Sequence, residues 1–269
     1  MSTTQTLTKP PEYWQLHGPG LFPEPPSRWR QTGLLMQWQL RRNAQMAPIY
    51  ITVQLLLAIA TVLGYGLLIG EPDRVASLYL TTGGPTISLV MVGLVMTPQW
   101  VAQARTEGSL AWMRTLPVPR PLFLVADLAV WTMMALPGLV VGLLVGAARF
   151  HVGLSISWPL IPGVLLVALT SSAIGYAIAN LFAPSLAQVL SQVFVFVIML
   201  FTPISFPASR MPDWAEQIHH WLPFEPMAQV VRSGLASADF TTPGRAWAVL
   251  SGWCLVSVAA AAWALGRRQ

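Results

Sequence analysis

Charge is what this sequence has least of. Only 9% of its 269 residues are Asp, Glu, Lys or Arg, whereas 54% are hydrophobic. A typical soluble domain carries about 25% charged residues, so this chain cannot cover an ordinary water-facing surface. The 12 tryptophans, 20 glycines and 23 prolines fit this interpretation, because membrane proteins tolerate or favour these residues. The composition therefore predicts an integral membrane protein.

Lysine and cysteine are almost absent as well. The only lysine, Lys9, precedes Pro10 and follows no glycine. This excludes a phosphate-binding P-loop, in which a Gly-rich turn ends in Gly-Lys-Ser/Thr, so any such ATP hydrolysis would belong to another polypeptide. A single cysteine excludes an intrachain disulfide framework. The arginines form no basic run, which argues against nucleic acid as a partner.

Stretches without charge mark six expected transmembrane helices, because a charge at a span's centre costs ~2.5–3.5 kcal/mol on insertion scales. The segment from Phe150 to Ser209 has no charged residue, which is enough for two spans divided by a turn at Pro184. The approximate spans are 47–69, 78–101, 128–148, 160–182, 186–206 and 246–266. They make up a transmembrane domain over residues 47–269, preceded by a Pro-rich arm at 1–26 that we expect to be flexible.

The distribution of basic residues predicts the orientation. An even number of spans places both termini on one side, and the loops of that side hold ten of the 15 Lys and Arg residues, against five on the other. Cytoplasmic loops carry the excess of Lys and Arg. Both termini are therefore expected in the cytoplasm.

Further helices are expected outside the spans. Residues 27–46 predict an amphipathic interfacial helix that begins after Ser27, with basic residues beside an apolar stripe; the alternative is a cytoplasmic extension of the first span. Arg105–Leu116 predicts a short cytoplasmic helix ended by Pro117. Between 207 and 245, two short amphipathic helices are expected, either re-entrant or only interfacial; the second has an apolar face formed by Met227, Val230, Val231 and Leu235. The fold class is thus an all-α integral membrane protein.

No catalytic constellation accompanies these helices. An intramembrane serine protease needs a histidine base within the membrane, and the four histidines all fall outside the expected spans. His219 and His220 complete no zinc motif, so no metal site is expected. Asp127, at the start of the third span, is interpreted as a helix-end residue stabilised by the helix dipole rather than as a proton relay.

One polar stripe within the fifth span points to transport. Gln188, Gln192, Phe196 and Met199 recur at steps of four, four and three, so they share a helix face. Polar residues inside spans usually face a cavity or another helix, and both alternatives remain open here. Phe and Met suit a bulky apolar or amphiphilic substrate, drug-like or lipid-like, more than a bare ion.

The order of three features resembles the membrane subunit of type-2 ATP-binding-cassette transporters, the group of daunorubicin-like and polysaccharide exporters. The first is the stretch from Arg105-Thr106-Glu107-Gly108 to Leu116-Pro117, which is similar to that family's coupling helix. The second is the Pro-rich segment from Pro203 through Met211-Pro212-Asp213-Trp214 to Leu222-Pro223 and Arg232. The third is the layout of six spans after an interfacial helix.

The resemblance implies a pore-forming permease in a bacterial cytoplasmic membrane. It would pair with a second permease subunit, identical or paralogous, and with two copies of a cytoplasmic ATPase that would bind ATP and Mg²⁺; the chain itself would need no cofactor. Spans one, two and five would border the export path. The implied ATPase-coupling residues are Arg105, Glu107, Gly108, Leu110, Met113, Arg114 and Leu116, and the implied outer-gate residues are Pro207, Pro212, Trp214, Pro223 and Arg232. The alternative function is a membrane-embedded enzyme or a non-transporting scaffold.

Overall fold

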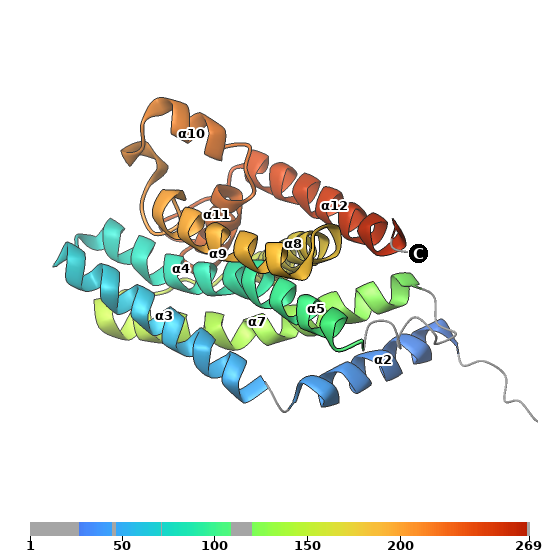
Figure 1. The fold of residues 1–269 in the computed structure, drawn as a ribbon. Helices are drawn as coiled ribbons and strands as arrows, with labels where there is room; N and C mark the ends of the chain where they lie inside the picture. The colour runs from blue at the N-terminus through green and yellow to red at the C-terminus, as the bar shows by residue number, and fades with distance from the viewer. Residues whose placement is uncertain (1–26, 45–46, 71, 109–119, 268–269) are drawn as a thin grey trace, which may run out of the picture.

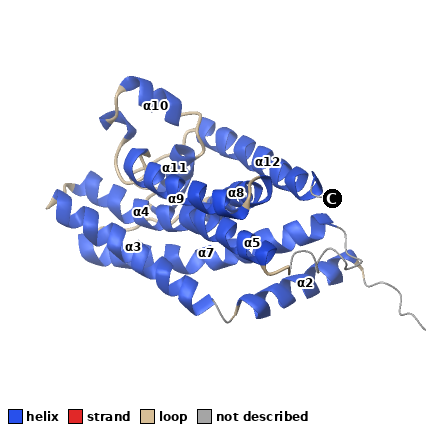
Figure 2. Cartoon of the chain, viewed as in Figure 1, coloured by secondary structure: helices blue, strands red, loops and turns tan. Residues whose placement is uncertain are grey.

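The computed structural model describes residues 27–44, 47–70, 72–108 and 120–267, and these residues are predominantly helical (Figures 1 and 2). The helices are α2 (Arg28–Asn43), α3 (Ala47–Ile69), α4 (Arg74–Met91), the π-helical segment η1 (Val92–Met96), α5 (Thr97–Thr106), α7 (Arg120–Phe150), α8 (Leu160–Leu181), α9 (Pro184–Phe201), the 3₁₀ turn η2 (Ala208–Arg210), α10 (Asp213–His219), α11 (Phe224–Leu235) and α12 (Gly244–Arg267).

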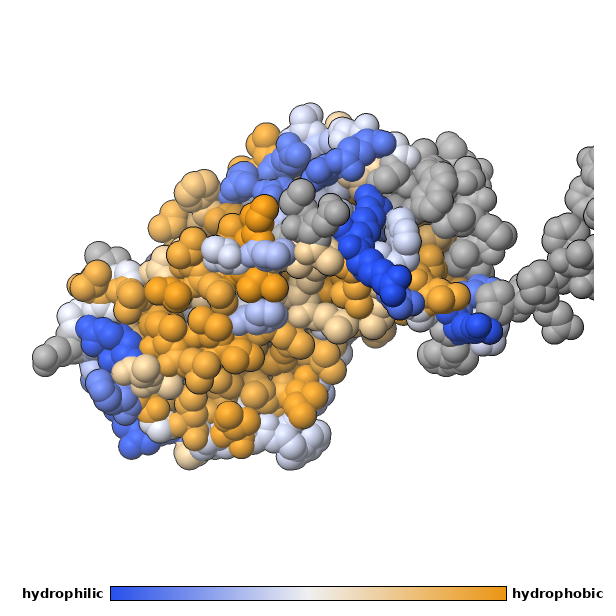
Figure 3. Space-filling view, turned by 90° about the horizontal axis from the view of Figure 1, so that it is seen from below, coloured by the Kyte–Doolittle hydropathy of each residue, from blue (hydrophilic) through white to orange (hydrophobic). Residues whose placement is uncertain are grey.

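Six helical segments in the described chain are long and apolar enough to cross a membrane, which confirms the predicted fold class. They are Ala47–Leu67, Arg74–Thr106, Pro121–Phe150, Leu160–Leu181, Pro184–Phe201 and Gly244–Gly266. Seen from below, the molecule presents a broad hydrophobic surface, with hydrophilic residues gathered toward its two ends (Figure 3). We name the two ends the α2 side and the α10 side after the helices that lie there (Figure 1).

The second span is the centre of the bundle. It runs without a break through α4, η1 and α5, and 89% of its most apolar window is buried. It crosses α8 closely, because a Cβ added to Gly175 would lie 2.0 Å from the carbonyl oxygen of Gly93. Small residues permit such backbone contact between membrane helices. The π-helical segment lies at this crossing, since Gly93 belongs to it.

Helix α7 approaches the second span through three glycines at steps of four. A Cβ on Gly138 would meet Ser88, one on Gly142 would meet Pro85, and one on Gly146 would meet Thr81. Residues four apart share one face of a helix, so this stripe lets α4 and α7 pack side by side. The same glycines bring α7 against α3, where Gln54 donates from Nε2 to the carbonyl oxygen of Met134 at 2.9 Å.

Several expected boundaries were wrong. The second span runs from Arg74 to Thr106 rather than from 78 to 101, so it is longer at both ends. The fifth span ends at Phe201 rather than at 206, because Thr202 precedes Pro203 and adopts an extended conformation. The third helix begins at Arg120, well before the expected residue 128. Asp127 therefore lies inside α7 and not in its first turn, so the helix-end interpretation does not hold. Its carboxylate instead hydrogen-bonds the side chain of Tyr176 on α8.

Helix α2 packs against the beginning of α7. Leu35 is buried against Phe123 and Ala126, whereas Leu34 on the neighbouring face stays exposed. The guanidinium of Arg42 lies over the rings of Trp38 and Trp100, at 5.3 and 4.9 Å from their centroids. These contacts attach α2 to the bundle at the end of the second span.

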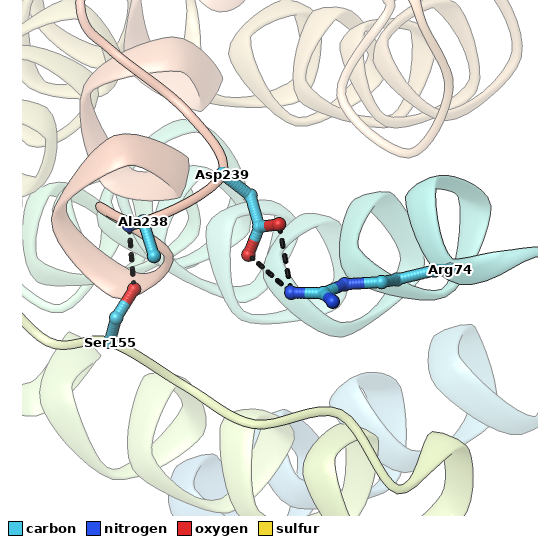
Figure 4. Close-up of polar contacts among 4 residues, drawn as sticks. All are labelled: Arg74, Ser155, Ala238 and Asp239. Carbon is cyan, nitrogen blue, oxygen red and sulfur yellow. Dashed lines mark hydrogen bonds and ion pairs between the residues drawn. The ribbon is translucent and has the colours of Figure 1, made fainter.

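On the α10 side, α10 and α11 differ sharply. Helix α11 buries its expected apolar face, formed by Met227, Val230, Val231 and Leu235, against α4, α8 and α12. Helix α10 leaves Trp214 and Ile218 exposed. The loop after α11 is held to two neighbours: Asp239 pairs with Arg74 at 3.0 Å, and the Ala238 N–H donates to Ser155 Oγ at 2.8 Å (Figure 4).

Candidate transport and docking surfaces

The two glutamines of the α9 stripe line a pocket on the α2 side of the bundle. Gln188 and Gln192 face a space of about 600 Å³ between α9, α5 and the first turn of α3. The remaining lining residues are Tyr50, Gln99, Ala102, Gln103, Thr106 and Val189. Four glutamines thus share one cavity within spanning helices, where an amide is stable only with a partner or water.

Sequence reasoning missed the α5 half of this pocket. Gln99 and Gln103 lie four residues apart, as do Gln188 and Gln192, so the same periodicity was present in both helices. The missing information was that α5 and α9 are neighbours. Tyr50 joins the pocket from α3, which no spacing within one helix indicates.

The other half of the stripe divides in two. Phe196 is 65% exposed, whereas Met199 is half-buried and packs against the core. The carbonyl oxygen of Met199 accepts a hydrogen bond of 3.1 Å from the hydroxyl of Tyr65 on α3. The structure therefore places Gln188 and Gln192 in one pocket, Phe196 on the surface beyond it, and Met199 at the contact between α9 and α3.

An apolar surface surrounds the pocket. Helices α3 and α9 are the least buried spans, with 22% and 17% of their most apolar windows buried. Their exposed large side chains are Ile49, Val53, Leu56, Leu63, Leu67, Leu186, Val189, Val193, Phe196, Val197, Leu200 and Phe201. A surface of this size contacts either lipid or another protein.

The predicted coupling residues lie at the end of α5, as far as the structure describes them. Glu107 is exposed and accepts a hydrogen bond of 2.7 Å from Gln103 Nε2. Gly108 has φ +73°, a left-handed conformation that ends the helix and that glycine adopts without steric cost. Leu110, Met113, Arg114 and Leu116 lie outside the described residues.

Arg105 has an internal role. Its Nη1 donates to the carbonyl oxygens of Ala179 and Phe182, the latter at 2.8 Å. Both acceptors belong to the C-terminal end of α8, whose last carbonyls have no partner within the helix. A cation is also favourable at this end of the helix dipole, so Arg105 attaches the end of the second span to α8.

The predicted gate prolines all begin helical segments. Pro207, Pro212 and Pro223 are the N-cap residues of η2, α10 and α11. Trp214, in the first turn of α10, is 69% exposed. The five gate residues are therefore not one cluster: the prolines set the chain direction, Trp214 projects outward, and Arg232 is buried.

Arg232 is buried on the α10 side, where several neighbouring segments contact its guanidinium. Its guanidinium lies 3.8 Å from the centroid of the Tyr79 ring, and its Nε donates to Thr82 Oγ1 at 3.3 Å. Its Nη2 donates to the carbonyl oxygen of Ile204. Burial lowers the pKa of Arg232 to about 10, which leaves it charged at neutral pH. It thereby joins α11, α4 and the turn after α9.

None of the curated proteins matches the chain at a significant level. A family profile described as ABC-2 family transporter protein matches residues 35–263, from within α2 to the last turns of α12. The match covers five spanning segments in full and the sixth as far as residue 263, together with the pocket and the α10 side. This multi-pass membrane protein therefore belongs to the ABC-2 family and is the membrane component of an ABC transporter.

Proposed function

We propose that the chain is the pore-forming permease of an ATP-driven exporter for a bulky apolar or amphiphilic substrate, drug-like or lipid-like. It works in a bacterial cytoplasmic membrane, with both termini in the cytoplasm. It pairs with a second permease subunit, identical or paralogous, and with two copies of a cytoplasmic ABC ATPase. ATP and Mg²⁺ are bound by those partners, and the α2 side faces them.

The observation that carries the proposal is the combination of pocket and surface on α9. The pocket offers polar side chains to water or to a substrate's polar group, and the adjoining Phe196 and Val193 offer apolar contact. An amphiphile needs both kinds of surface in one place. On a helix that faced only lipid, Gln188 and Gln192 would be unfavourable, since each unpartnered amide costs free energy in hydrocarbon.

The exposed faces of α3 and α9 support a second permease subunit at this position. Two such faces placed together would enclose the pocket between subunits and give a path bordered by spans one, two and five. Movement of the second span would reach the pocket directly, because Gln99 and Gln103 belong to α5. The ATPase would act at the end of the same helix, near Glu107.

Cysteine chemistry tests this arrangement. In a Cys254→Ser background, cysteine at Gln192 or Phe196 should cross-link to a partner subunit or react with a water-soluble thiol reagent, and the reactivity should change with nucleotide when the ATPase is present. Cysteine at Leu255, exposed on α12, is the matched control and should stay inert to both reagents.

Two results would contradict the proposal. If positions 192 and 196 behave like 255 in every nucleotide state and are quenched by lipid-borne probes, the α9 stripe faces the bilayer. If no ABC ATPase co-purifies with the folded permease and stimulates substrate efflux from vesicles, the chain does not act as an exporter subunit.

A further inference from the structure

A second cavity lies on the α10 side, away from the pocket on α9. It measures about 160 Å³ and is lined by Tyr79 of α4, by Glu225, Gln229 and Arg232 of α11, and by Phe240 of the following loop. Pro203, Ala208, Thr241 and Pro243 complete its wall. This volume exceeds several-fold what a single buried water needs. The space therefore suits a small molecule and not a bulky amphiphile.

Glu225 is the unusual member of this wall. It is 4% exposed, and its Oε1 accepts a hydrogen bond of 2.7 Å from Gln229 Nε2. Its Oε2 is buried and has no hydrogen-bond partner among the described residues. A buried charged group without its full set of partners is costly, and burial accordingly raises the pKa of the Glu225 carboxyl. Since the last torsion of a glutamate side chain is broad, Oε2 can turn toward the cavity at little cost.

Three basic side chains, His219, His220 and Arg245, lie close enough to act on the charge of Glu225, but within the described residues none of them hydrogen-bonds its Oε2. His220 Nε2 lies 3.7 Å from Oε1, beyond hydrogen-bond distance, and an equal 3.7 Å from Glu216 Oε1. Arg232, seven residues along α11, lines the same cavity but donates from Nε to Thr82 and from Nη2 to Ile204. Within the described chain, no hydrogen bond uses Arg232 Nη1. The cavity thus has an acceptor on one wall and a cation with spare donors on another.

We infer that this cavity binds a small zwitterion, whose primary ammonium pairs with Glu225 and whose acidic group lies toward Arg232. The two charges of such a ligand match the two charges of the wall, whereas a simple cation would meet Arg232 and a simple anion would meet Glu225. The ammonium supplies N–H donors to Oε2, and such charge-assisted hydrogen bonds are stronger than those between neutral groups. The ligand would be about the size of an amino acid or of phosphoethanolamine.

Isothermal titration calorimetry with phosphoethanolamine tests the inference on the purified full chain in detergent. Wild-type protein should bind phosphoethanolamine roughly ten-fold or more tightly than ethanolamine or inorganic phosphate, each of which has one of the two charges. Phosphocholine, which has no ammonium N–H, should bind as weakly as phosphate. Equal affinity for all four probes, or no binding of any, would overturn the inference.

Matched variants locate the site. Glu225→Gln should weaken phosphoethanolamine binding roughly ten-fold or more, whereas Glu216→Gln, which changes the other carboxylate near His220, should not. Ala208→Leu narrows the cavity without touching a charge and should also abolish binding, so the test stands even if Glu225→Gln fails to fold. Binding that survives Ala208→Leu in folded protein would place the ligand elsewhere and refute the assignment.

The same assay distinguishes the two possible sources of the zwitterion, a lipid headgroup and a free solute. In nanodiscs that contain phosphatidylethanolamine, a lipid headgroup ligand would compete with soluble phosphoethanolamine and weaken its apparent affinity; in nanodiscs of phosphatidylglycerol alone it would not. Unchanged affinity in both would assign a free solute. No ATPase is needed, so failure here leaves the proposed export function untouched, and failure of export leaves this site untouched.

Discussion

The second and fifth spans are both apolar, yet the bundle buries the second and leaves the fifth largely exposed. The second, α4 through α5, has the lowest mean hydropathy of the six and is the most buried, with 89% of its window inside the protein. The fifth, α9, is more hydropathic and has only 17% buried. In a membrane protein, then, hydropathy does not rank helices by burial. Lipid is as apolar as leucine, so a helix gains nothing from hydrophobicity alone when it moves to the centre.

What distinguishes the second span is the size of its side chains. Thr81, Thr82, Gly83, Gly84 and Ser88 follow one another along α4, and all are buried. Small residues let helices approach until their backbones touch, and dispersion then replaces the lipid contacts. Helix α9 presents Val, Leu and Phe instead, which suit lipid or a partner surface. The comparison predicts that substitutions of equal size have unequal effects in the two spans.

The largest effect is expected where the second span crosses α8. Gly175→Val places carbon atoms against the backbone of Gly93, which cannot move away as a flexible side chain would. We expect little or no folded protein by size-exclusion chromatography in detergent, since overpacking costs about 1–3 kcal/mol or more. Gly252→Val on α12 is the control, because nothing lies within 4 Å of its added Cβ. Equal yields of the two variants would show that the crossing is not close.

A smaller effect is expected from truncating one leucine in each environment. Leu94, in η1, is fully buried, whereas Leu200, in α9, is 66% exposed. Leu94→Ala should lower the unfolding free energy by roughly 2 kcal/mol, because it leaves a cavity, and should lower the Tm accordingly. Leu200→Ala should change stability by less than about 0.5 kcal/mol in the isolated subunit. A larger loss for Leu200→Ala would mean that the purified protein already has a partner on α9.

The sequence predicted the helices well because each carries its own local signal. Charge-free stretches gave six spans, and the apolar face of α11 was correctly identified from its spacing. Local chemistry also explains the miss at the end of α9, because Thr202 before Pro203 is a helix boundary that can be read without a structure. No local signal indicated the early start of α7, since the charged residues Arg120 and Asp127 are typical of a loop outside the membrane.

The arrangement of sites was less accessible. Gln188 and Gln192 were found from their period, but Gln99, Gln103 and Tyr50 became partners only when three helices met. Glu225 was overlooked because a glutamate next to prolines in a polar loop is ordinary in sequence; its burial arises from the packing of α11. The Arg105 side chain shows the same limit, since nothing near residue 105 indicates that the end of α8 lies beside it.

Arg105 and Glu107 give the finest comparison, because they lie two residues apart at the same end of the second span. Arg105→Ala removes the donors that bind the carbonyl oxygens of Ala179 and Phe182. The half-buried side chain is partly screened by solvent, so we expect a loss of about 1 kcal/mol in unfolding free energy and a lower Tm before any ATPase is added.

Glu107→Ala, at an exposed position, should leave the Tm unchanged but weaken association with the ATPase or substrate-stimulated turnover, as should Leu110→Ala. Pull-down of the ATPase by each folded variant separates the two roles. If Arg105→Ala is as stable as the wild type but no longer binds the ATPase, Arg105 belongs to the docking surface. If Glu107→Ala and Leu110→Ala, singly and together, bind the ATPase and support turnover normally, the ATPase does not act at the end of α5.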